Sequence, residues 1–141
     1  MEIPWFVPSE LGEVVASLER HSLSESFWAR REERRALRRL ASLTQADLAK
    51  RVGTNPTTIT RWETGTRKGR GRAAELYRRI MTELEVAAIA RFHFLATLNE
   101  FRGADPPDQR RMERRLAVAL ARALETDTEL WPLSFAGGLP R

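Results

Sequence analysis

The stretch 43–65 constrains the fold of this 141-residue chain more than any other part of it. It predicts a helix over 45–52 with Thr44 as its N-cap, then a tight turn that contains glycine. A second helix is expected over 56–63, because Pro56 is well tolerated at a first helical position, where its missing N–H costs nothing. The inner faces of the two helices are apolar: Leu48, Ala49, Val52, Ile59 and Trp62.

Helical periodicity dominates the rest of the chain, and strand signals are almost absent. We expect further helices over 9–20, 24–41, 72–101 and 108–125. The pattern over 72–101 is long for a globular domain, so this helix either breaks near Thr82 or extends its second half to pack on a partner. The fold class predicted from these patterns is all-α.

The helix expected over 24–41 is rich in arginine. Ser22 to Glu25 has the spacing of a capping box, which favours a helix start near Ser24. Its core candidates are Trp28, Leu37 and Leu40. Its polar face is expected to carry Arg30, Arg31, Arg34, Arg35, Arg38 and Arg39. Pairing with glutamates one turn away is the ordinary explanation of such a run, so most of it is not part of the candidate site.

The positive charge of the chain lies in its centre. Residues 30–82 contain fifteen basic and five acidic side chains, a net charge of +10, whereas the whole chain carries only +5. The segments on either side are acidic or nearly neutral. This asymmetry points to a polyanion as the partner of the central segment.

Several other classes of function lack support in the sequence. The chain has no cysteine and only two histidines, His21 and His93, far apart, so we expect neither a metal site nor a cofactor. No catalytic motif is present, so we expect no enzyme activity. No apolar stretch is long enough to span a bilayer, and residues 1–6 lack the features of a secretory signal, so a soluble, cytoplasmic protein is expected.

The predicted helix 56–63 carries side chains suited to DNA. Its exposed face holds the hydroxyls of Thr57, Thr58 and Thr60 together with the guanidinium of Arg61. Hydroxyls and guanidinium groups can hydrogen bond both to base edges in the major groove and to phosphates.

The two helices resemble the helix-turn-helix of the Xre family, the type found in lambdoid phage repressors and Cro. The resemblance covers about Arg38 to Met81 and rests on four short motifs at family spacing: Leu43-Thr44-Gln45, Leu48-Ala49, Val52-Gly53 and Ile59-x-x-Trp62-Glu63-x-Gly65. It implies a lambda-repressor-like bundle, which N-terminal and C-terminal helices extend in this chain.

The resemblance also implies contacts with the DNA backbone. Gln45, at the N-terminus of the first motif helix, would bind a phosphate with help from the helix dipole. Thr54 and Asn55 would lie at the backbone beside the second helix. The loop that follows this helix in the family tracks the DNA backbone, and its basic residues here are Arg67, Lys68 and Arg70.

Base reading is implied for the second motif helix. Pro56, Thr57 and Arg61 fall at the family's reading positions, and guanine is the expected target of Arg61. Thr58 would meet a phosphate or a thymine methyl group. Pro56 departs from the polar residue often found at its position, so it would read only a methyl group or the shape of the groove.

Three other positions are expected to be structural. Arg38 and Glu63 match a family ion pair, and Trp62 is expected in the core. Arg34 is a departure, because the family usually places an aliphatic core residue there.

These observations predict three parts: an N-terminal helical extension over 1–27, a DNA-binding domain over 28–82, and C-terminal helices with an apolar tail over 83–141. The expected function is a sequence-specific regulator that binds double-stranded DNA, most simply a dimeric repressor whose C-terminal helices form the dimer. One alternative is an antitoxin-like autoregulator whose tail, from Trp131 to Phe135, binds a protein partner. Another is a monomer that reads an asymmetric site, with a second DNA surface around Arg110, Arg111, Arg114 and Arg115.

Overall fold

The computed structural model describes residues 9–21, 27–66 and 68–132. The described part is all-α, as the sequence predicts. Its elements in chain order are α1 (Ser9–His21), a 3-10 turn (Phe27–Ala29), α2 (Arg31–Leu40), α3 (Gln45–Val52), α4 (Pro56–Thr64), α5 (Arg72–Gly103) and α6 (Pro106–Glu125). No helix in the described ranges is long and apolar enough to cross a membrane.

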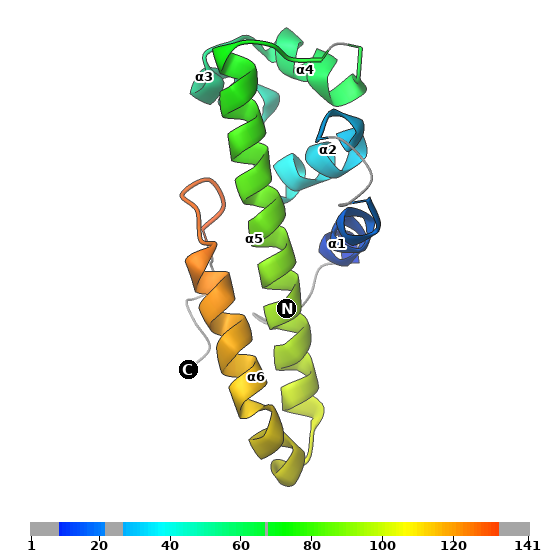
Figure 1. Cartoon of the computed structure of the whole chain (residues 1–141), viewed down its shortest axis with the longest axis vertical. Helices are drawn as coiled ribbons and strands as arrows, with labels where there is room; N and C mark the ends of the chain where they lie inside the picture. The colour runs from blue at the N-terminus through cyan, green and yellow to red at the C-terminus, as the bar shows by residue number, and fades with distance from the viewer. Residues whose placement is uncertain (1–8, 22–26, 67, 133–141) are drawn as a thin grey trace.

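The long helix α5 is the axis of the molecule (Figure 1). The motif helices α3 and α4 lie at its N-terminal end, α1 and α2 pack on one side, and α6 runs back along its second half. Of the two alternatives for this helix, a break near Thr82 does not occur, since the helix continues without interruption to Gly103. The partner of its second half is α6 of the same chain.

The N-terminal helix shares one core with the motif. Four apolar side chains of α1 belong to the same buried cluster as Leu48, Ile59 and Trp62 of the motif helices. These four are Leu11, Val14, Val15 and Leu18. A smaller cluster around Phe94 and Ala123 joins α5 to α6.

The predicted helix over 24–41 is partly wrong. The described chain makes a 3-10 turn at Phe27–Ala29, and the α-helix begins only at Arg31. The neighbouring rings of Phe27 and Trp28 both contact Tyr77 of α5, with ring centroids 5.8 Å and 6.0 Å from it. This packing on a distant part of the chain accompanies the 3-10 turn, and helical periodicity does not reveal it. The capping box proposed at Ser22 and Glu25 lies outside the described residues.

The caps and turns of the motif are those that the sequence predicts. Thr44 and Asp47 form a reciprocal capping box at the start of α3. The hydrogen bond from the Thr44 backbone N–H lowers the pKa of Asp47 below its ordinary value. Gly53 and Gly65 end α3 and α4 with φ of +81° and +75°, the left-handed region in which glycine avoids strain.

Candidate DNA-binding surface

Three arginines of α2 hold the C-terminal end of α4. Arg31 donates to the carbonyl of Thr64 at 2.8 Å, and Arg34 donates to the carbonyl of Trp62 at 2.9 Å. Arg38 completes the set through an ion pair with the Glu63 carboxylate at 2.6 Å. Cationic groups at a helix C-terminus also oppose the helix dipole. Helix α2 therefore fixes the position and direction of α4.

The ion pair predicted between Arg38 and Glu63 is confirmed. Arg38 makes two hydrogen bonds to the Glu63 carboxylate and a third to the carbonyl of Leu43. Glu63 is buried and also accepts a hydrogen bond from Gln45 at 3.1 Å. One carboxylate thus ties α2, α3 and α4 together.

The placement of Arg34 on a polar face is wrong, because its side chain is fully buried. Its guanidinium carbon lies 4.9 Å from the ring centroid of Phe27, 5.4 Å from that of Trp28 and 5.7 Å from that of Tyr77. Burial lowers the pKa of Arg34 from its ordinary value, while Tyr77 and Glu63 act in the opposite direction. Aromatic faces stabilise a guanidinium, which explains how an arginine can occupy a position that is usually aliphatic.

Trp62 lies in the core, as predicted. Its ring centroid is 4.9 Å from that of Tyr77 and 5.9 Å from that of Trp28. The same tryptophans fix the basic loop, because Gly69 packs directly against them. A Cβ atom at Gly69 would lie only 2.7 Å from Trp28 and 3.0 Å from Trp62. Lys68 and Arg70, on either side of Gly69, are both exposed.

The exposed face of α4 carries the side chains predicted to read bases. Pro56, Thr57 and Arg61 are all exposed. Among the described residues, no hydrogen bond or ion pair restrains the guanidinium of Arg61. Arg61 therefore lies about one helical turn after Pro56 and Thr57 on α4. The N–H groups of its guanidinium are available to solvent or to a ligand.

Asn55 is the N-cap of α4. Its side-chain oxygen accepts hydrogen bonds from the backbone N–H of Thr58 at 2.9 Å and from the Thr58 hydroxyl at 3.2 Å. This oxygen is therefore used within the cap, and the amide N–H₂ of Asn55 is the group that can meet a phosphate. A hollow beside this cap brings together residues that the sequence analysis placed at the DNA backbone: Thr54, Thr58, Lys68 and Arg70.

Gln45 is more constrained than the sequence suggests. Its side-chain amide donates to Glu63, and its side-chain oxygen accepts a hydrogen bond from the Thr60 hydroxyl at 2.9 Å. With the side-chain oxygen and one amide N–H engaged in this way, the second amide N–H of Gln45 and the backbone N–H groups in the first turn of α3 are the donors left for a phosphate. Of the ten candidate residues, only Arg67 lies outside the described part of the chain.

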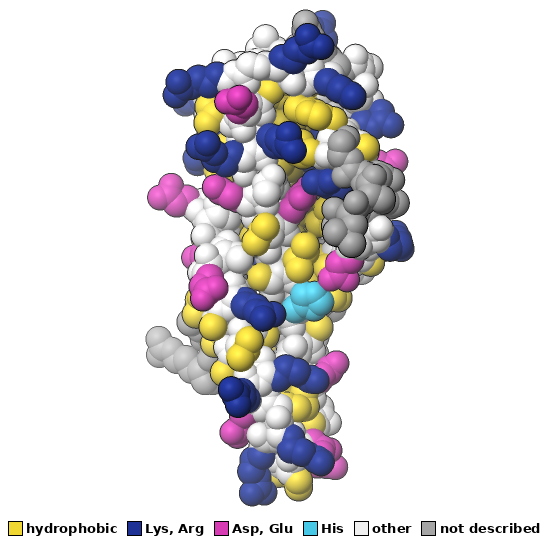
Figure 2. Space-filling view, viewed as in Figure 1, with side chains coloured by type: hydrophobic (Ala, Val, Ile, Leu, Met, Phe, Trp, Pro, Cys, Tyr) yellow, Lys and Arg dark blue, Asp and Glu magenta, His cyan; other side chains and the backbone are white. Residues whose placement is uncertain are grey.

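A second hollow adds a residue that the sequence analysis left out. It lies on the other side of the start of α4, where Thr44, Gln45 and Pro56 meet the exposed Arg39 of α2. Arg39 was left out with the rest of the arginine run, because sequence alone does not separate it from Arg34 and Arg38, which point inward. In space-filling view, Lys and Arg side chains gather at this end of the molecule (Figure 2).

Comparison with known proteins agrees with this description of the motif. A family model described as helix-turn-helix matches residues 35–70, which include all of α3 and α4 and the basic loop up to Arg70. No curated protein and no solved structure matches the chain.

Proposed function

A chain that carries an Xre-type helix-turn-helix domain at residues 35–70 is a DNA-binding transcription regulator, and we propose that it is a repressor that reads the major groove with α4. The matched family is a DNA-binding family and not an enzymatic one. The repressor assignment rests on the resemblance to phage repressors.

One observation supports this proposal more than any other. The C-terminal end of α4 is held by three arginines of α2, while its N-terminal face is exposed between two hollows with basic residues in their walls. A recognition helix must be held rigidly at the protein and left open toward the groove, with cations placed for the phosphates on either side.

We assign roles to the residues as follows. Arg61 reads a guanine, Thr57 contacts a neighbouring base edge, and Pro56 meets a methyl group or the shape of the groove. The remaining proposed contacts are to phosphates or to the DNA backbone. They come from Gln45, Thr54, Asn55, Thr58, Arg67, Lys68 and Arg70, and the structure leads us to add Arg39.

Each of the three parts of the chain has its own role in this proposal. Residues 28–82 form the DNA-binding unit, and α1 of the N-terminal extension over 1–27 supports it through the shared core. Residues 83–141 serve in dimer formation. Trp131 does not support the antitoxin-like alternative. The guanidinium carbon of Arg91 lies 4.2 Å from the centroid of its ring, and the ring packs on the core of its own chain. The other apolar residues of the tail, Leu133 and Phe135, lie outside the described residues.

Selection of bound sequences from random double-stranded DNA tests the proposed function. We expect a defined motif to be enriched, and we expect its affinity to fall as salt is raised, since Lys and Arg contacts with phosphates release counterions. Single-stranded DNA of the selected sequence serves as the control and should bind much more weakly. Absence of enrichment at low salt would contradict the proposal.

A further inference from the structure

A groove runs between α5 and α6 on the face shown in Figure 2. Its floor is mainly apolar and includes Val86, Ile89 and Ala90 from α5 and Val118 and Ala119 from α6. Val86 is 49% exposed and Val118 45% exposed, and they are two of the three large apolar residues that stand out on the described surface. Exposed apolar side chains that gather in a groove and are rimmed by polar ones are a feature of surfaces that bind a partner.

The basic residues of this groove come from one helix only. The α6 side carries Arg111, Arg114, Arg115 and Arg122, with Glu125 at its end. Arg111 and Arg115 are paired with Asp108 and Glu100 of their own chain, so Arg114 and Arg122 contribute most to the positive charge of this side. The α5 side contributes Val86, Ile89, Ala90, His93 and Thr97, and therefore neither lysine nor arginine. Glu83 of α5 borders the hollow that continues the groove beyond Val86.

A second copy of the chain can cover this face in two symmetric ways. With the twofold axis perpendicular to the helices, α6 of one copy lies over α6 of the other, so arginines face arginines. With the axis parallel to the helices, each α6 lies over the α5 of the partner copy. The two arginine-bearing helices are then diagonal in a four-helix bundle, and each meets a stripe that has no lysine or arginine.

The position of the motif favours the same arrangement. Helices α3 and α4 lie at the end of α5 farthest from the turn into α6 (Figure 1). An axis parallel to α5 places both recognition helices at one end of the dimer, where one DNA duplex can meet them. The perpendicular axis places them at opposite ends. This step rests on the proposed function, whereas the argument from charge does not.

We propose that the groove between α5 and α6 binds a second copy of this chain in a parallel, twofold-symmetric four-helix bundle. Val86 and Val118 are buried at the interface, and the arginines of α6 lie over the α5 of the partner copy. The dimer presents two α4 helices to half-sites roughly one helical turn, about 34 Å, apart.

Val118→Glu is the variant that tests the interface, and Leu124→Glu is its matched control. Leu124 is also on α6 and is 50% exposed, but it does not line the groove. Sedimentation should give twice the mass of one chain for the original protein and for Leu124→Glu. Val118→Glu should show a twofold drop in mass, with its helical circular dichroism unchanged. A monomeric original protein, or a dimer that survives Val118→Glu, would overturn the proposal.

Disulfide cross-linking tests the orientation and does not depend on a destabilising charge. The chain has no cysteine, so single-cysteine variants give unambiguous products. Ala90→Cys and Val118→Cys lie near the middle of the two stripes. In the parallel bundle, a mixture of the two variants forms the mixed disulfide. Self-cross-linking of Val118→Cys alone in high yield would instead indicate the perpendicular axis and overturn the stated orientation.

These results are separable from the DNA-binding proposal. If the protein is a dimer of this kind but selects no DNA sequence, the proposed function fails and the interface stands. If Val118→Glu binds a single half-site as the original protein does but loses cooperative binding to the inverted repeat, both proposals are supported.

Discussion

Arg38 holds Glu63 through two hydrogen bonds to one carboxylate, from Nε at 2.6 Å and from Nη2 at 3.0 Å. The two residues are 25 positions apart and join α2 to the last turn of α4. Glu63 is almost completely buried, and Arg38 is nearly so. The orientation of α4 therefore depends on an ion pair that is shielded from solvent.

Glu63→Ala should strongly destabilise the domain. Removing one partner leaves the Arg38 guanidinium largely buried without its counterion, which costs about 3 to 5 kcal/mol in comparable pairs. Urea unfolding followed by circular dichroism measures the loss. Glu100→Ala is the control, since its ion pair with Arg115 is exposed and should contribute less than about 1 kcal/mol. Equal effects of the two substitutions would contradict the structural role of Glu63.

Arg34→Ala should cost more stability than Arg34→Met. Alanine leaves a cavity among Phe27, Trp28 and Tyr77, and emptied core positions of this size cost about 2 to 5 kcal/mol. Methionine fills much of the space and removes a buried charge, and such replacements are often tolerated. Thermal unfolding of both variants measures the difference. If Arg34→Met were as unstable as Arg34→Ala, the hydrogen bond from Arg34 to the Trp62 carbonyl would outweigh packing.

Tyr77→Phe should change stability only at high pH. Burial raises the pKa of Tyr77 to about 12, and its hydroxyl has no hydrogen-bond partner among the described residues. The folded state favours the neutral hydroxyl, so this contribution is complete below the unfolded pKa of about 10 and is lost as the pH rises toward 12.

The comparison requires the free energy of unfolding of both proteins at pH 8 and pH 11. At pH 8 they should agree within about 1 kcal/mol, because phenylalanine preserves the packing. At pH 11 the original protein should lose about 1 kcal/mol more than the variant. Identical losses would show that Tyr77 ionises in the folded state as it does in the unfolded one.

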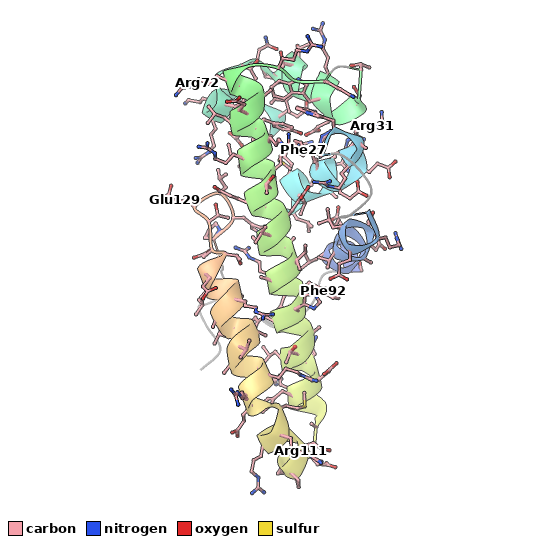
Figure 3. All side chains as sticks on the ribbon, viewed as in Figure 1. Phe27, Arg31, Arg72, Phe92, Arg111 and Glu129 are labelled. Atoms are coloured by element: carbon pink, nitrogen blue, oxygen red, sulfur yellow. The ribbon has the colours of Figure 1, made fainter. Side chains whose placement is uncertain are left out.

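Lys68→Ala should weaken binding to all DNA sequences alike. A lysine in the basic loop contacts a phosphate in our account, so its removal should reduce the slope of log affinity against log salt by about one unit. Arg110→Ala is the control, because Arg110 is exposed beside Arg111 at the far end of the molecule (Figure 3). A salt slope that Lys68→Ala leaves unchanged would remove the loop from the DNA contacts.

The sequence predicted the motif well because its signals are local. Thr44, Gly53, Pro56 and Gly65 each specify a cap or a turn through their own backbone chemistry, and the structure has all four as expected. The pair of Arg38 and Glu63 came from the family resemblance, and it too is present.

The arginines of α2 were harder to interpret. Helical periodicity describes which residues share a face but not which face is buried, so the charge of Arg34 predicts a solvent-facing side chain. Its burial depends on three aromatic rings from Phe27, Trp28 and Tyr77, which meet only in the folded chain. For the same reason the sequence does not identify Arg39 as a candidate contact, because its position beside Pro56 depends on how α2 packs against the motif.

The end of α5 posed a similar difficulty. The apolar pattern of its second half indicates a packing partner, but the pattern cannot say whether that partner is another chain. The structure shows that α6 covers one side of this half, and that Val86 remains exposed on another. Helix α5 thus has one face covered by α6 and another face exposed. Its apolar periodicity alone does not show which of the two faces is covered.

The central claim is that α4 reads bases through Arg61, and parallel site selection with the original protein and Arg61→Ala tests it most directly. Arg110→Ala serves as the control in the same selection. The account predicts that Arg61→Ala costs about 1 to 3 kcal/mol of affinity and loses the preference for guanine at one position of each half-site, while the other positions keep their preference. An Arg61→Ala motif identical to that of the original protein, at equal affinity, would contradict the claim.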